Sequence, residues 1–170
     1  MQIRPVKAQE LDALTALARE TYRAAYAHDM PQPALDWHLE TYLSRSRTEE
    51  MMWRDVVLVA ANGVQLAGFV QFGAAEHADS GLAEVEIRRL YLLSAFQNQG
   101  TGARLMAAAL AHPQLQGARR VLVGVWHTNM AAQRFYARFG FVQVGEKPYW
   151  TQAGDTAGAD LLLVRVQMKD

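Results

Sequence analysis

The stretch that decides the fold covers residues 84–110 and reads EVEIRRLYLLSAFQNQGTGARLMAAAL. Its first part has the β-branched, aromatic and apolar content of a strand, and its last part is a run of strong helix formers that ends before Pro113. Gly100 and Gly102 lie in the polar turn between the two. Glycines at a helix start leave backbone N–H groups open to a ligand, and the helix dipole adds positive charge there. The stretch therefore predicts a strand, a phosphate-binding turn and a helix.

The glycine spacing excludes two common phosphate-binding loops. A nucleoside-triphosphate loop needs Gly-x-x-x-x-Gly-Lys-Ser/Thr, and a dinucleotide-binding turn needs a third glycine where this chain has Leu105. The spacing that is present is Gln-x-x-Gly-x-Gly, starting at Gln97, after a strand that ends Arg-Leu-Tyr-Leu. For this stretch taken alone, a glycine-rich turn that binds only water is the alternative.

Composition and charge set the class of protein. With 170 residues and 51% hydrophobic content, residues 1–170 are expected to form a single domain around one core. The formal net charge is zero, so no overall field favours nucleic acid or an anionic membrane. The absence of cysteine excludes disulfides, thiolate metal ligands and a cysteine nucleophile. The first residues indicate a strand rather than a signal segment, and we expect a soluble, cytoplasmic protein.

The remaining patterns predict an α/β fold with a mixed, mostly antiparallel sheet. Apolar spacing predicts about four flanking helices, at residues 9–27, 35–43, 102–111 and 129–139. About six to seven strands are expected, at residues 3–6, 56–61, 65–72, 84–92, 121–126, 141–144 and 160–166. Asn62-Gly63 predicts the hairpin turn between the second and third of these, and residues 73–83 and 151–159 read as loops. A helix separates residues 84–92 from 121–126, so we expect these two strands to be parallel and to splay apart at their ends.

A second motif makes the pattern specific. It runs from Gly124-Val-Trp-x-x-Asn129 through Phe135-Tyr136 to Gly140-Phe141. The two motifs in this order resemble the GCN5-related N-acetyltransferase superfamily, which binds acetyl-CoA at a splayed pair of parallel strands and transfers its acetyl group to an amine. Within that superfamily the motifs are similar to the PaiA-like acetyltransferases, a branch associated with spermidine and spermine.

The resemblance implies a set of residues that bind acetyl-CoA as a cosubstrate. Backbone amides of the glycine turn would hold the pyrophosphate, and the splayed strand would pair with the pantetheine arm. Asn129 would contact that arm, and Arg138 would reach the ADP phosphates unless it is an ordinary exposed helix arginine. The implied cofactor-binding residues are Leu90, Tyr91, Leu92, Gln97, Asn98, Gln99, Gly100, Thr101, Gly102, Ala103, Asn129 and Arg138.

Tyr136 is the general acid that the resemblance implies. A phenol titrates near pH ~10 and a thiol near ~8.5, so a phenol beside a departing thiolate can protonate it and then regain its proton. A tyrosine that only packs its helix on the core is the alternative.

Two residues of the strand at 84–92 are candidates for the group that accepts a proton from the substrate amine. Glu86, or Glu84 two residues earlier on the same strand face, would accept the proton directly or through water. Some relatives carry a glutamate on the second central strand where this chain has Gly124, which favours Glu86 here. The alternative for Glu86 is an ion pair with Arg88 or Arg89.

The expected acceptor is a primary amine, with a polyamine as the most specific hypothesis. Acidic and aromatic side chains on the expected acceptor side favour a polycation, and the alternative is that they are surface groups balanced by His28, His38, Arg45 and Arg47. The acidic and aromatic residues are Asp29, Asp36, Trp37, Glu40, Tyr42, Glu76 and Asp79. A protein or peptide amine is a second acceptor class, and an acyl-CoA-binding regulator without turnover is a second functional class.

Other chemistries lack their motifs. No serine lies in Gly-x-Ser-x-Gly, and the histidines show no metal-binding spacing, so we expect neither a hydrolase nor a metal. The expected partners are acetyl-CoA and a small amine, with no nucleic acid and no membrane, and the resemblance implies a homodimer.

Overall fold

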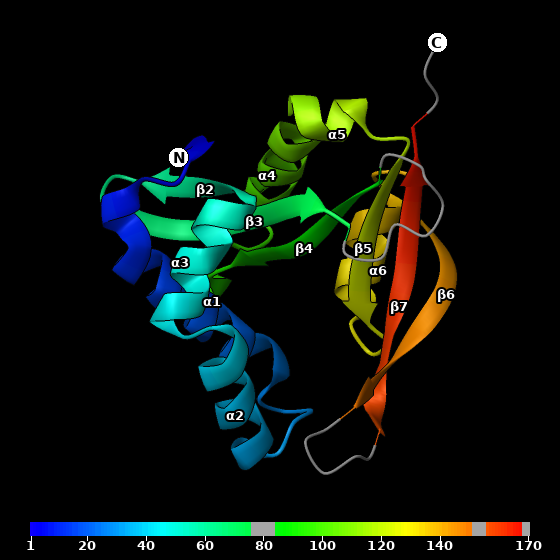
Figure 1. Ribbon diagram of the computed structural model, residues 1–170, viewed down its shortest axis with the longest axis horizontal. Coiled ribbons are helices and arrows are strands. Elements are labelled where there is room, and N and C mark those ends of the chain that lie inside the picture. Colours follow the sequence, from blue (N-terminus) through cyan, green and yellow to red (C-terminus); the bar gives the residue numbers. More distant parts are fainter. Residues whose placement is uncertain (76–83, 151–155, 168–170) are drawn as a thin grey trace. The chain divides into compact units, whose positions relative to one another are not determined.

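The computed structural model describes residues 1–75, 84–150 and 156–167 and shows a mixed α/β fold (Figure 1). Backbone pairing links seven strands in the order β1-β2-β3-β4-β5-β7-β6. The strands are β1 (Gln2–Pro5), β2 (Val56–Asn62), β3 (Gln65–Ala74), β4 (Glu84–Leu92), β5 (Arg120–Trp126), β6 (Val142–Trp150) and β7 (Thr156–Val166). The helices are η1 (Ala8–Glu10), α1 (Leu11–Tyr26), α2 (Gln32–Tyr42), α3 (Arg45–Arg54), η2 (Ser94–Phe96), α4 (Thr101–Leu110), α5 (Pro113–Gly117) and α6 (Met130–Ala137).

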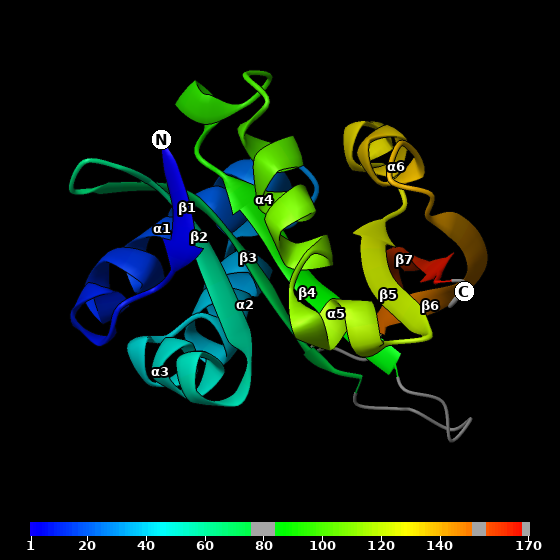
Figure 2. The ribbon, with the colours of Figure 1, turned by 90° about the horizontal axis from the view of Figure 1, so that it is seen from above.

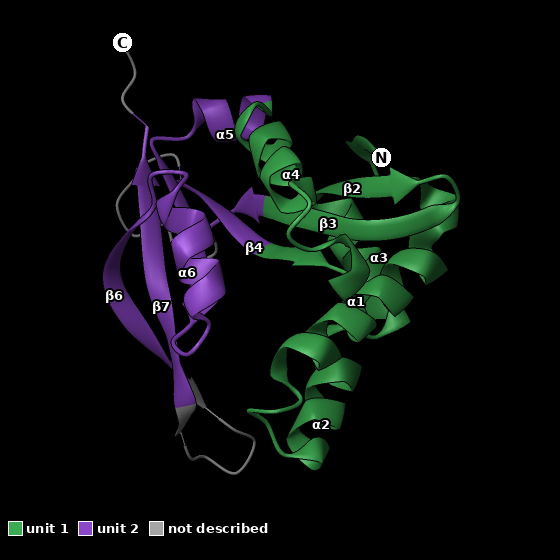
Figure 3. Ribbon diagram, turned by 180° about the vertical axis from the view of Figure 1, so that it is seen from behind, with its two compact units in different colours: residues 1–72, 89–112 green, residues 73–88, 113–170 purple. Residues whose placement is uncertain are grey.

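The chain divides into two compact units (Figure 3). Unit 1 contains Met1–Phe72 and Arg89–His112, and unit 2 contains Gly73–Arg88 and Pro113–Asp170. The boundary falls inside β4, so the first part of this strand belongs to unit 2 and the last part to unit 1.

Unit 1 buries both faces of β2. Val57, Val59 and Ala61 alternate along the strand and share one buried cluster with α1, α2 and α3. Leu58 and Ala60 are buried on the other side, where α4 packs (Figure 2). Burial on both faces explains why β2 reads as a continuous apolar run rather than an alternating one.

The helices of unit 1 follow from apolar spacing, with one exception. The helix predicted at residues 9–27 is present as η1 and α1, and the one at 35–43 as α2. α3 was not predicted, because its sequence RSRTEEMMWR is mostly polar and buries only Thr48 and Met51. Its one local signal is Ser44, whose side chain caps the helix by accepting from the Arg47 N–H.

The hairpin between β2 and β3 is confirmed, but its turn lies one residue further along the chain than predicted. Asn62 pairs with Gln65, so the central residues of the turn are Gly63 and Val64. Gly63 has φ +64 and no positive φ occurs at Val64. This is the arrangement of a two-residue hairpin turn with glycine at its first position. Valine is tolerated at the second position, because that position does not need a positive φ.

Unit 2 contains the predicted parallel pair. β4 and β5 are in parallel register from Glu84 opposite Arg120 to Ile87 opposite Val123. In the part of the chain that the structure describes, the two strands have no further register pairs, although β4 continues to Leu92 and β5 to Trp126.

The C-terminal strands are longer than predicted. β6 and β7 pair antiparallel from Val142 opposite Val164 to Trp150 opposite Thr156, and β7 also pairs with β5. Residues 151–159 were predicted to be a loop, but the part of them from Thr156 to Ala159 pairs with β6 and is extended. Residues 151–155 of this predicted loop lie outside the described residues. α6 packs on one face of the three strands and is shorter than predicted, and α5 begins at Pro113, which was expected only to end a helix (Figures 1 and 2).

Gly68 allows β3 to lie unusually close to the end of β4. A Cβ built on Gly68 would lie 2.7 Å from the carbonyl oxygen of Tyr91 and 2.8 Å from Cγ of Leu92. A hydrogen bond from the Leu93 N–H to the Ala67 carbonyl, 2.9 Å long, holds the same two segments together. Any side chain at this position would therefore push on the backbone of β4.

We expect Gly68→Ala to destabilise the protein by about 1–3 kcal/mol, the usual cost of overpacking a filled interior. Gly145→Ala is the matched control, because Gly145 is also in a strand but a Cβ there meets no heavy atom within 4 Å. Urea unfolding of both variants measures the difference. Equal stability of the two variants would show that β4 shifts freely and that the close approach is not a constraint.

Candidate active site

The turn before α4 has the backbone shape of an anion-binding site. Asn98 and Gly100 both have left-handed backbones, with φ 57 and φ 79, and Gly100 is the N-cap of α4. The helical conformation starts at Thr101. A left-handed residue followed by a right-handed one turns successive N–H groups toward one point, which forms a concave site for an anion.

Three backbone donors at this helix start are open. The first backbone bond of the helix runs from the Arg104 N–H to the Gly100 carbonyl, 3.0 Å. Among the residues that the structure describes, no acceptor is found for the N–H groups of Thr101, Gly102 and Ala103. A Cβ on Gly100 would meet no heavy atom within 4 Å, so nothing in unit 1 fills the space beside the cap. These residues fit the diphosphate of an acyl-CoA.

The glutamines of the motif support the turn through their side chains. Gln97 Nε2 donates to the Leu92 carbonyl at 3.2 Å, and Gln99 Nε2 donates to the Ala95 carbonyl at 2.8 Å. Both bonds tie the turn to the segment that leaves β4. This explains why glutamine, with a long side chain that carries a donor, recurs around the glycines.

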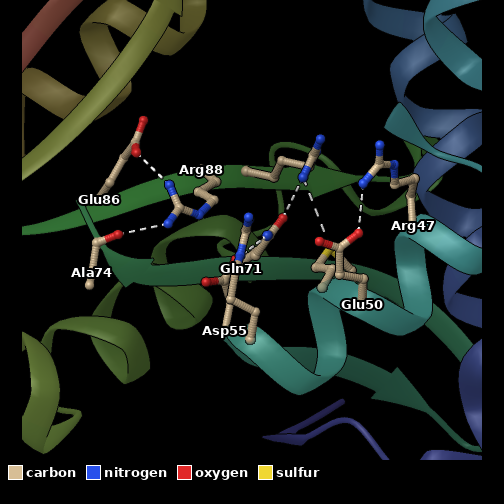
Figure 4. Close-up of polar contacts among 10 residues, drawn as sticks. Arg47, Glu50, Asp55, Gln71, Ala74, Glu86 and Arg88 are labelled. Atoms are coloured by element: carbon tan, nitrogen blue, oxygen red, sulfur yellow. Dashed lines mark hydrogen bonds and ion pairs between the residues drawn. The ribbon is translucent and has the colours of Figure 1, made fainter. Parts of the chain in front are cut away.

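The sequence did not predict a buried polar chain beneath the end of β4. Gln71 is fully buried; its Nε2 donates to Oδ2 of Asp55 and its Oε1 accepts from the Arg89 guanidinium at 2.6 Å. Figure 4 shows Gln71 beside Asp55, which also pairs with Arg54 at 3.2 Å. Desolvation lowers the pKa of Arg89 from its usual value. A glutamine inside the apolar run Phe-Val-Gln-Phe was the available signal.

His38 is part of an aromatic cluster on α1 and α2. Its ring stacks on Tyr22, with centroids 4.1 Å apart and planes 8° apart, and also contacts Tyr42 at 4.7 Å. Burial, with the charge of Arg89 as a second cause, lowers the pKa of His38 to about 4. The imidazole is therefore neutral at neutral pH and cannot balance a carboxylate there, contrary to the surface-charge alternative.

The acidic residues of the expected acceptor side have local partners. Glu40 pairs with Arg19 at 2.5 Å, Asp36 accepts from Gln32 at 2.8 Å, and Asp29 lies 3.5 Å from His28. Two further residues of the prediction, Glu76 and Asp79, lie outside the described residues. Arg45 and Arg47 pair with other acids, namely Asp12 and Glu50.

Trp37 and Tyr42 both lie on α2. Their rings meet edge to face, with centroids 5.7 Å apart. Tyr42 is 46% exposed, so part of its side chain is accessible although its ring contacts both Trp37 and His38.

Tyr136 on α6 is buried against aromatic neighbours. Its ring is 6% exposed and meets Phe135 and Phe141 edge-on, with centroids 5.3 and 5.4 Å away. Its carbonyl accepts from the Phe139 and Phe141 N–H groups, which closes the helix before Gly140. The packing fixes the ring and leaves its role as an acid a prediction.

Asn129 and Arg138 lie at the two ends of α6. Asn129 is the N-cap, and its Oδ1 accepts from the Ala132 N–H at 3.0 Å. Arg138 is exposed, with its guanidinium 5.7 Å from the centre of the Phe135 ring. Their contacts to a cofactor stay predictions, and the capping role of Asn129 is a second reason for asparagine at that position.

The carboxylates of β4 are both ion-paired. Glu86 accepts from Arg88, whose other terminal nitrogen donates to the Ala74 carbonyl at 2.7 Å (Figure 4). Glu84 pairs with Arg120 of β5 at 2.8 Å. Arg88 occupies one Glu86 oxygen, so an incoming amine would have to compete with a guanidinium.

Asp160 is a carboxylate that the sequence prediction did not single out. It is half-buried at the start of the apolar run Leu-Leu-Leu-Val of β7, and burial raises its pKa. Charges on Lys147 and His127 act in the opposite direction. A lone acid opening an apolar strand was the signal in the sequence.

The structure groups the predicted residues by unit. Unit 1 brings together the end of β4 and the glycine turn, including Leu90, Tyr91, Leu92 and Gln97 to Ala103. Unit 2 carries Glu86 on β4 and Asn129, Tyr136 and Arg138 on or beside α6.

The described residues include neither a helix suited to a membrane nor a cluster suited to a metal. No helix within residues 1–75, 84–150 and 156–167 has the length and apolar character needed to cross a membrane. Within the same ranges, no group of three or more metal-binding side chains is placed to hold a metal ion.

Comparison with known proteins places the chain in a family. The acetyltransferase (GNAT) family matches residues 11–141. An uncharacterised N-acetyltransferase of Mycobacterium tuberculosis is 30% identical over 142 residues, which cover 82% of this chain and 88% of the relative. The spermine/spermidine N(1)-acetyltransferase of Bacillus subtilis is 29% identical over 84 residues, 48% of this chain and 55% of the relative.

A solved structure has the same fold. The PaiA N-acetyltransferase of Thermoplasma acidophilum, in complex with coenzyme A, matches with a TM-score of 0.77 and 19% identity, covering 98% of both chains. The family match spans most of the chain and the fold agrees, so this chain belongs to the acetyltransferase (GNAT) family of acetyl-CoA-dependent N-acetyltransferases.

Proposed function

We propose that this chain binds acetyl-CoA through the start of α4 and transfers the acetyl group to a primary amine, with a polyamine such as spermidine or spermine as the acceptor. The observation that carries the proposal is the set of open N–H groups after the left-handed Gly100. A diphosphate there would accept from Thr101, Gly102 and Ala103, and the dipole of α4 would favour its charge.

The reaction needs an acid for the leaving thiolate and an acceptor for the proton of the ammonium. Tyr136 supplies the acid in this proposal, since its ring is held by Phe135 and Phe141 and only its hydroxyl would have to reach the sulfur. Glu86 is the proton acceptor that the β4 motif suggests, with Glu84 or an ordered water as alternatives. The pairing of Glu86 with Arg88 and of Glu84 with Arg120 counts against both carboxylates in the state described.

The polyamine hypothesis has support from similarity and from one part of the surface. The B. subtilis relative acts on spermine and spermidine by its name, although it aligns with only 48% of this chain. The half-exposed Tyr42 side chain is accessible to a cation, which aromatic rings attract. The local partners of Asp29, Asp36 and Glu40 reduce the charge that these residues offer to a polycation.

A protein or peptide amine is the competing acceptor, and binding of acetyl-CoA without turnover is the competing activity. A homodimer and a cytoplasmic location remain predictions from the sequence and its resemblance.

The cofactor proposal predicts the effect of Gly102→Val. A branched side chain at the helix start would stand against the diphosphate, so the affinity for acetyl-CoA should fall at least tenfold while the fold is kept. Ala107→Val is the matched control, because Ala107 is exposed on the same helix away from its N-terminus. Calorimetric titration measures both. Unchanged affinity in a folded Gly102→Val variant would remove this turn from the binding site.

The acid proposal predicts the effect of Tyr136→Phe. This variant keeps the ring between Phe135 and Phe141 and deletes only the hydroxyl, so turnover should fall by ~10²–10⁴ with little change in acetyl-CoA affinity. Phe135→Leu is a control for lost packing. It should lower the unfolding temperature, while turnover measured below that temperature should stay near that of the parent. Turnover equal to that of the parent would show that another group protonates the thiolate.

The acceptor proposal is tested by thiol release with a panel of amines. Spermidine and spermine should be acetylated, with a Michaelis constant that rises with salt because attraction between exposed charges is screened. Glu40→Gln should raise that constant more than it lowers turnover, while Glu20→Gln, the same charge change at an exposed position on α1, should not. Saturation by a peptide or a neutral-tailed amine, with no turnover of either polyamine at low salt, would favour the competing acceptor class. No thiol release with any amine would favour the regulator.

A further inference from the structure

Asp160 lies over the one position of β5 that has no side chain. Register pairs Asp160 with Trp126 of β5 and Lys147 of β6, and pairs Gly124 with Leu162. A Cβ built on Gly124 would lie 3.7 Å from Asp160 Cβ and 3.8 Å from its Cγ and Oδ2. Asp160 and Gly124 are therefore diagonal neighbours on one face of the sheet, and the carboxyl group leans across the glycine.

This carboxylate differs from the others on its face. The parallel register places Glu86 beside Leu122, two residues before Gly124, so Glu86 faces the same side of the sheet as Asp160. Glu84 and Glu86 each accept from an arginine. Among the residues that the structure describes, no donor hydrogen-bonds to the Asp160 carboxyl and no cation lies within ion-pair distance of it.

The surroundings of Asp160 raise its affinity for a proton. Burial raises its pKa, and the indole of Trp126, 8% exposed, is its apolar neighbour on β5. The charged or titratable groups that act on it are Lys147 from β6 and His127 at the end of β5, and both oppose the rise. A half-buried carboxylate with open lone pairs and raised basicity is suited to accept a proton from an ammonium group.

Gly124 leaves open space beside the Asp160 carboxyl, where a Cβ would be in ordinary van der Waals contact with it. The parallel register ends at Val123, so Gly124 is the first residue of β5 that is not paired with β4. In this chain a glycine leaves the space above β5 free, and the diagonal neighbour on β7 fills it with a carboxylate.

We propose that Asp160 is the proton acceptor for the amine substrate, in place of Glu86. The ammonium of the acceptor gives one proton to the Asp160 carboxylate, which passes it to solvent. The freed lone pair forms the nitrogen–carbon bond to the acetyl carbonyl, and the carbon–sulfur bond breaks. The thiolate takes a proton from Tyr136, and the proton lost by the new amide nitrogen restores the phenol, so one proton is released per turnover.

This inference rests on the proposed amine acetylation and is tested by pH–rate profiles of Asp160→Asn and Glu86→Gln. The acceptor is spermidine, or the amine with the highest kcat/KM in the panel. Asp160→Asn should lower kcat/KM by ~10²–10⁴ near neutral pH, and the loss should shrink as pH approaches the pKa of the amine, where free amine no longer needs a base. Glu86→Gln should lower kcat/KM less than Asp160→Asn at every pH below the pKa of the amine, and acetyl-CoA affinity should be unchanged in both.

Lys147→Gln is the second variant, at an exposed position. Removing this positive charge should raise the pKa of Asp160 further and move the acidic limb of the profile to higher pH. A merely structural Asp160 would not respond in this way.

Several results would overturn the proposal. They are an Asp160→Asn profile that superimposes on the parent, a loss that is equal at every pH, a pH-dependent loss in Glu86→Gln instead, or an acidic limb that Lys147→Gln does not move. A parent that acetylates no amine would contradict the proposed function itself, whereas an active parent with any of these results would contradict only the role of Asp160.

Discussion

β4 is held in two different ways along its length, and this constraint shapes the rest of the protein. Its first four residues are in parallel register with β5, and that register ends at Ile87 and Val123. On its other edge β4 neighbours β3, and its last residues lie so close to Gly68 of β3 that even a Cβ there would collide with them. Beyond Ile87, the described residues of β4 and β5 have no further register pair, so the ladder between these two strands ends there while β3 remains the neighbour of β4 on its other edge.

The polar chain from Arg89 through Gln71 to Asp55 extends this constraint into the interior of unit 1. Gln71 can make this link because one side-chain amide both donates to a carboxylate and accepts from a guanidinium. Removing the amide would take one hydrogen bond from the buried Asp55 carboxylate and one from the desolvated Arg89 guanidinium, and lost bonds to buried charged groups are costly. The interior of unit 1 therefore fixes the position of β4 by directional bonds as well as by apolar packing.

The parts of the fold that the sequence predicts well are those with a strong local period. β2, β3, β4, α1 and α4 have clear apolar patterns, and the parallel relation of β4 and β5 follows from the helix between them. α3 escaped prediction because its ten residues bury only Thr48 and Met51, so tertiary packing rather than pattern makes it a helix. The hairpin turn moved by one residue because register, set by the pairs along both strands, decides which residues sit at its tip.

The candidate site was predictable where it is built from backbone and less so where it is built from side chains. Left-handed φ angles at Asn98 and Gly100 follow from residue types that tolerate them, and the glycines were readable in advance. The sequence did not show which carboxylate lacks an ion pair. That property depends on which arginines the strand register brings beside each carboxylate. Glu86 meets Arg88 two residues along its own strand, and Glu84 meets Arg120 across the parallel pair.

Asp160 has no hydrogen-bonded or ion-paired partner among the described residues, although Lys147 lies opposite it on β6 and acts on it electrostatically. Its other neighbours are the indole of Trp126 across the strand and Gly124 on the diagonal. Keeping a half-buried carboxylate without a hydrogen-bonded partner costs stability, and a chain selected for stability alone would place an apolar side chain in the run Leu-Leu-Leu-Val. The combination of an empty position at Gly124 and an unpaired acid leaning over it is therefore better explained by chemistry at the end of the parallel register than by packing.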